Sequence, residues 1–66
     1  MNTKKQYVDK LLKIDRYLYT QNNINYQMFR DDLIKRYYNL SKGTLRSKLA
    51  WKKKLATING YNLKNL

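Results

Sequence analysis

The chain has 66 residues, lacks proline, cysteine and histidine, and carries a formal net charge of +11 at pH 7. This length allows one small domain, which we take as residues 1–66, and the absence of Cys and His excludes disulfides and a Cys/His zinc site. Its four acidic residues are all aspartates, which leaves no acid–base pair or thiol nucleophile for catalysis. We therefore expect a non-enzymatic protein with no cofactor and no metal.

A first helix is predicted over residues 3–20. Thr3 is a suitable N-cap, and the polar stretch at residues 20–23 favours a turn, because asparagine side chains bond their own backbone. Between them, apolar residues recur at helical spacing and should face the core: they are Tyr7, Val8, Leu11, Leu12, Ile14 and Leu18.

A second helix is predicted over residues 25–38, with Asn25 as its N-cap. Residues 39–40 form a short connector, after which Ser41 can cap a third helix over residues 41–54. The second helix should bury one stripe and the third helix two leucines: the stripe is Tyr26, Phe29, Leu33, Ile34 and Tyr37, and the leucines are Leu45 and Leu49.

The tail contains Asn59-Gly60, a dipeptide that strongly favours a two-residue hairpin turn. Residues 56–58 and 61–63 would then pair as a short β-hairpin. In the alternative, the third helix continues to Ile58 and Gly60 caps it in the left-handed conformation. We take the hairpin, so the predicted fold class is mainly α, a three-helix helix-turn-helix with a short C-terminal β-hairpin wing.

The positive charge lies mostly in the C-terminal half. All four aspartates precede residue 33, and no acidic residue follows. Such a segment repels itself unless it meets a polyanion, and nucleic-acid phosphate is the natural partner. We expect its cations to converge on one side of the fold; from residue 39 on they are Lys42, Arg46, Lys48, Lys52, Lys53, Lys54 and Lys64.

The outer face of the third helix has the side chains that a major groove accepts. Opposite Leu45 and Leu49, the helical wheel places small residues and cations, so the helix can lie deep in the groove and reach base edges. These residues are Gly43, Arg46, Ser47, Ala50 and Lys54. Trp51 falls between the two faces, where it either packs against the first helix or offers a stacking platform for an unpaired base.

The run from Phe29 to Leu49 resembles the helix-turn-helix of winged-helix proteins, and the resemblance extends over about residues 26–63. In that family a Leu-Ser-x-x-Thr-Leu stretch opens the recognition helix; here it is Leu40, Ser41, Thr44 and Leu45. The resemblance implies DNA contacts by Lys42, Thr44, Arg46 and Ser47, and a wing tip at Asn59, Gly60 and Tyr61. Lys64 is the one cation of this wing.

Size, charge and a terminal hairpin are also similar to those of the small excisionases of mobile elements. The composition is similar to that of the small DNA-binding accessory proteins that accompany replication enzymes on staphylococcal mobile cassettes. We expect a DNA-binding accessory protein whose contacts include Lys42, Thr44, Arg46, Ser47, Lys48, Trp51, Lys52, Lys53, Lys54, Asn59, Tyr61 and Lys64.

Two alternatives use the same chain differently. The protein could hold single-stranded DNA beside a polymerase, primase or helicase, with Trp51 as the stacking residue. It could instead be a protein-interaction adaptor with an aromatic docking surface, made of Tyr7, Tyr17, Tyr19, Tyr37 and Tyr38. Since no 18-residue apolar run and no signal-peptide pattern occur, we expect a cytoplasmic protein.

Overall fold

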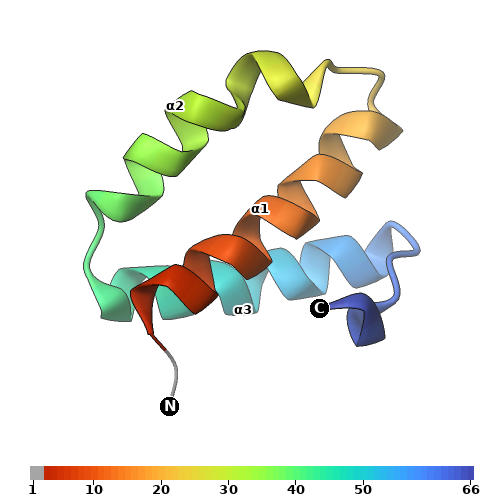
Figure 1. The fold of residues 1–66 in the computed structure, drawn as a ribbon. Helices are drawn as coiled ribbons and strands as arrows, with labels where there is room; N and C mark the ends of the chain where they lie inside the picture. The colour runs from red at the N-terminus through yellow and green to blue at the C-terminus, as the bar shows by residue number, and fades with distance from the viewer. Residues whose placement is uncertain (1–2) are drawn as a thin grey trace.

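Three α-helices and one turn of 3-10 helix make up residues 3–66, the part of the chain that the computed structural model describes. They are α1 (Lys4–Gln21), α2 (Tyr26–Tyr38), α3 (Lys42–Ile58) and η1 (Leu63–Asn65). α1 packs against both α2 and α3 and lies between them in Figure 1. The mainly α-helical class predicted from the sequence is therefore confirmed.

All three predicted N-caps are confirmed. The Thr3 hydroxyl accepts a hydrogen bond from the Gln6 amide at 3.3 Å, and the Gln6 side chain bonds back to the Thr3 amide. Asn25 caps α2 by accepting from the Gln27 amide at 3.1 Å, and Ser41 caps α3 by accepting from the Thr44 amide at 3.2 Å. These caps satisfy amides that have no partner inside their own helix.

The predicted β-hairpin wing is wrong, and no strand occurs within residues 3–66. Residues 56–58 are the last turn of α3, and Gly60 has a φ of +89°. The Tyr61 amide donates to the Ala56 carbonyl at 2.9 Å and the Gly60 amide to the Thr57 carbonyl at 3.0 Å. This pair of bonds is the Schellman motif, which ends a helix with glycine in the left-handed region. The alternative of a helix to Ile58 capped by Gly60 is thus confirmed.

The core is built by one face of each helix. α1 contributes three aliphatic residues, α2 contributes two tyrosines and a leucine, and α3 contributes two leucines and an alanine. Phe29, expected in the core, is 41% exposed. The buried residues are Val8, Leu11, Ile14, Tyr26, Leu33, Tyr37, Leu45, Leu49 and Ala56.

A buried polar cluster joins the three helices at their centre. Asp15 of α1 is fully buried, and its carboxylate accepts hydrogen bonds from the Tyr37 hydroxyl of α2 and from the Lys52 ammonium of α3, the latter at 2.8 Å. Burial, reinforced by the bond to Asp15, raises the pKa of Tyr37 well above its ordinary value. Tyr37 therefore stays a neutral donor, and each side chain of the cluster has its partner.

Candidate nucleic-acid interface

Most cations of the C-terminal half have no acidic partner in the structure. Within residues 3–66, ion pairs join Lys5 to Asp9, Arg30 to Asp31 and Lys52 to Asp15. Lys52 is thus a structural residue, with 28% of its side chain exposed, rather than a free phosphate contact. Six cations after residue 38 remain unpaired, and these are Lys42, Arg46, Lys48, Lys53, Lys54 and Lys64.

The side of α3 that faces away from the core is a ridge of mixed chemistry. Ser47, Trp51, Lys54 and Ile58 follow one another at i, i+4, i+7 and i+11, and all four are exposed. Trp51 is 65% exposed and Ile58 is 82% exposed. Of the two alternatives for Trp51, packing against α1 is therefore wrong, and its indole is free to meet a ligand.

Gly43 and Ala50 flank this ridge as small exposed residues. A Cβ added at Gly43 would meet nothing within 4 Å, so the space around this position is open. Ser47 is a third small exposed residue on this side of α3. A ligand can therefore approach α3 closely at its N-terminal half.

The remaining cations of α3 lie on its two flanks, so they do not converge on one side as expected. Arg46 and Lys53 line a hollow of about 240 Å³ between α1 and α3. Lys48 lines a second hollow, of about 290 Å³, together with Arg36 of α2 and the paired Lys52. The basic surface of α3 therefore consists of two flanks on either side of the ridge.

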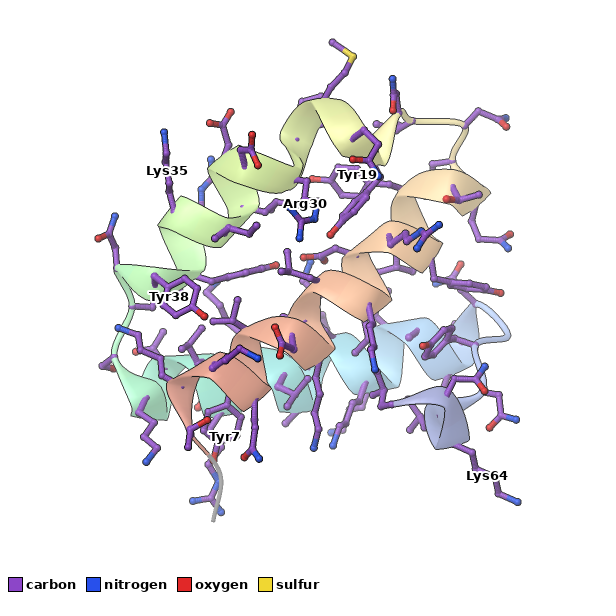
Figure 2. The ribbon with its side chains drawn as sticks, in the orientation of Figure 1. Tyr7, Tyr19, Arg30, Lys35, Tyr38 and Lys64 are labelled. Atoms are coloured by element: carbon purple, nitrogen blue, oxygen red, sulfur yellow. The ribbon has the colours of Figure 1, made fainter. Side chains whose placement is uncertain are left out.

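The residues predicted at the wing tip have structural roles. Tyr61 packs on Tyr17 with ring centroids 4.8 Å apart, and the Tyr17 hydroxyl donates to the Asn59 carbonyl at 2.8 Å. The Asn59 side chain donates to the Leu55 carbonyl at 2.8 Å. These contacts fasten the end of α3 to α1. Lys64 projects from η1, well separated in Figure 2 from the N-terminal part of α3.

Polar groups at the start of α3 are already hydrogen-bonded to one another in the N-cap. The Thr44 amide donates to the Ser41 hydroxyl, and the Ser41 hydroxyl in turn donates to the Thr44 hydroxyl at 2.9 Å. The Thr44 hydroxyl is therefore less available to a ligand than its position in the helix-turn-helix motif implies. Lys42, the first residue of the helix, is exposed and unpaired within residues 3–66.

The tyrosines do not form one exposed aromatic surface. Tyr37 is buried, Tyr7, Tyr17 and Tyr19 are half-buried, and Tyr38 is 43% exposed. Tyr19 packs edge-on against Tyr26 and Phe29, and it lies between α1 and α2 in Figure 2. The aromatic content of the chain thus serves mainly to join α1 to its neighbours.

Two residues of α1 belong to the basic surface although the sequence reasoning omitted them. Tyr7 and Lys10 line the same hollow as Arg46 and Lys53. The sequence gives Lys10 as one charged residue on the solvent side of an amphipathic helix. The sequence pattern does not show that α1 and α3 lie side by side, which is what brings Lys10 close to Arg46 and Lys53.

Comparisons with protein-family models, with curated proteins and with solved structures give no match for this chain. Within residues 3–66, none of the helices is both long enough and apolar enough to cross a membrane.

Proposed function

We propose that the protein binds DNA through α3. The observation that carries this proposal is the set of cations along α3 that have no carboxylate partner within residues 3–66. Unpaired like charges on one helix repel each other, and phosphates relieve that repulsion while releasing counterions.

The arrangement of these cations fits a duplex better than a single-sided patch would. A major groove is about 12 Å wide and admits one α-helix, and a phosphate backbone borders it on each side. On α3, Arg46 and Lys53 lie on one flank and Lys48 on the other. Ser47 and Lys54, on the ridge between the flanks, would then face the base edges.

The salt dependence of binding tests this proposal. Each phosphate contact that is removed should flatten the log–log slope of affinity against salt by about one unit. We expect this for Lys53→Ala and for Lys48→Ala with a duplex of mixed sequence. Lys35→Ala is the matched control, because Lys35 is an exposed lysine that points outward from α2, away from α3 (Figure 2). Equal slopes for all three variants, or no binding in dilute buffer, would refute the proposal.

Trp51 supports a second candidate function, the binding of single-stranded DNA. An indole that is 65% exposed beside Lys48 and Lys54 is placed as a stacking platform for an unpaired base. Stacking on an aromatic side chain contributes about 1–3 kcal/mol per base, so Trp51→Ala should weaken single-strand binding by about 5-fold to 150-fold. Strong quenching of Trp fluorescence by a short oligonucleotide, with weaker duplex binding, would favour this candidate.

If Trp51→Ala leaves the affinity for duplex DNA unchanged and the protein prefers one duplex site, the first candidate is favoured. The accessory role on a mobile element stays a prediction from the resemblance to small basic proteins of such elements. It gains no support from a wing, since α3 continues through the first strand of the predicted hairpin.

A further inference from the structure

A hollow between α1 and α3 gathers three cations from two helices. Lys10 comes from α1, and Arg46 and Lys53 come from α3, where they lie about two turns apart on the same flank. Tyr7, Leu49 and Ala50 complete the lining, so no carboxylate borders the hollow. Tyr7 lies at the N-terminal end of α1, on the side of that helix where α3 runs (Figure 2).

The burial of these cations makes the hollow different from an ordinary basic surface. Lys10 and Lys53 are both half-buried, and neither forms an ion pair within residues 3–66. Cations from facing helices repel each other, which an anion between them would reverse.

We propose that this hollow binds one backbone phosphate of the bound nucleic acid, so that the interface extends from α3 onto α1. The proposal rests on the proposed function, and it adds Lys10 and Tyr7 to the contacts. A phosphodiester carries one charge and two free oxygens, which Arg46 can hold in a bidentate fork while the lysines act as point charges. The Tyr7 hydroxyl is a further possible donor to the same group.

A second hollow, next to the first along α1, indicates the direction in which a bound nucleic-acid strand would run. It is lined by Lys13, Arg16, Tyr17, Thr20 and Tyr61 and likewise has no carboxylate. Lys13 follows Lys10 by three residues, so both project from adjoining parts of the α1 surface. A strand that leaves the first hollow would therefore continue past Lys13 toward the C-terminal end of α1.

The test compares salt slopes for Lys10→Met, Lys13→Ala and the control Lys35→Ala, using one fluorescently labelled oligonucleotide of mixed sequence. Lys10→Met keeps a long apolar side chain at this position and removes the charged ammonium. We expect it to flatten the slope by about one unit, so that affinity falls about threefold to fourfold less between about 50 and 200 mM salt. Lys10→Gln serves as the second variant should the methionine variant lower the melting temperature.

The outcomes separate this inference from the proposed function. A flattened slope for Lys10→Met, with Lys35→Ala unchanged, supports the hollow as a phosphate site. An unchanged slope for Lys10→Met, while Lys48→Ala still flattens it, would overturn the hollow and leave DNA binding by α3 standing. If Lys10→Met, Lys48→Ala and Lys53→Ala all leave the slope unchanged, both proposals fail. Added inorganic phosphate at the same ionic strength should compete no better than sulfate, because the site is proposed for a strand and not for a free ion.

Discussion

Replacing Lys52 should lower the stability of the folded protein without removing a contact between the protein and DNA phosphates. Its ammonium lies 2.8 Å from the carboxylate of Asp15, which is fully buried. Lys52→Met removes this charge and leaves a buried carboxylate with the Tyr37 hydroxyl as its remaining side-chain donor. Breaking a buried pair in this manner costs about 3–5 kcal/mol, and we take about 3 because the lysine side chain is 28% exposed.

That loss is large for a chain of this size. A domain of 66 residues is expected to have an unfolding free energy of roughly 3–10 kcal/mol, and about 3 kcal/mol corresponds to a fall of about 12–24 °C in melting temperature. Thermal unfolding followed by circular dichroism measures this directly. Lys54→Met is the matched control, because Lys54 is exposed on the outer ridge of α3 and its removal should change the melting temperature little.

A double variant distinguishes the lost ion pair from a packing defect. Replacing the whole pair with apolar residues is often neutral, because no uncompensated charge stays buried. Asp15→Leu combined with Lys52→Met should therefore recover much of the stability that Lys52→Met loses. If Lys52→Met melts like the unmodified protein and instead flattens the salt slope of DNA binding, Lys52 faces solvent and the reasoning is wrong.

The remaining predictions concern pH and the ends of α3. Because burial raises the pKa of Tyr37 while an unfolded tyrosine ionises near 10.0, its contribution to stability is complete below pH 10 and is lost as the pH rises above it; Tyr37→Phe should make alkaline unfolding curves less steep. Gly60→Ala should destabilise by about 1–2 kcal/mol in urea unfolding, because a φ of +89° is strained for a residue with a Cβ. Gly43→Ala should stabilise by about 0.5 kcal/mol, because it is helical with open space around it; equal effects of the two glycine substitutions would contradict the Schellman motif.

The helices could be predicted from the sequence because capping and periodicity agree at each start. Thr3, Asn25 and Ser41 precede runs with helical spacing, and the observed helices begin one residue after each of them. The first two helices also end within one residue of the prediction. Local propensity and burial favour the same conformation in these segments, so no tertiary information was needed.

The tail could not be decided by Asn-Gly, because this dipeptide suits both a type I′ turn and a left-handed helix cap. The deciding pattern lies upstream. Leu45, Leu49, Lys52 and Ala56 occupy positions i, i+4, i+7 and i+11, so Ala56 continues the inner face of α3. Its complete burial shows that the core needs a helix there and not a strand.

The Asp15–Lys52 pair could not be predicted from sequence patterns, because these assume that every charged residue is exposed. Asp15 falls on the apolar side of α1, seven residues after Val8 and four after Leu11. A carboxylate at such a position indicates a buried partner, but the partner's identity depends on how α3 packs across α1. The wheel of α3 places Lys52 on the inner face with Leu45 and Leu49, but it does not show which acidic residue Lys52 meets there.

This buried pair also determines which side chains of α3 a ligand can reach. Successive residues of a helix are turned by about 100° from each other, so fixing Lys52 inward at Asp15 sets the directions of the residues around it. Trp51 is then turned outward to 65% exposure, and Lys53 is turned into the hollow beside α1. Lys54 is left on the outer ridge. The Lys52-Lys53-Lys54 run therefore divides into one lysine that orients the helix and two that the proposed interface can use.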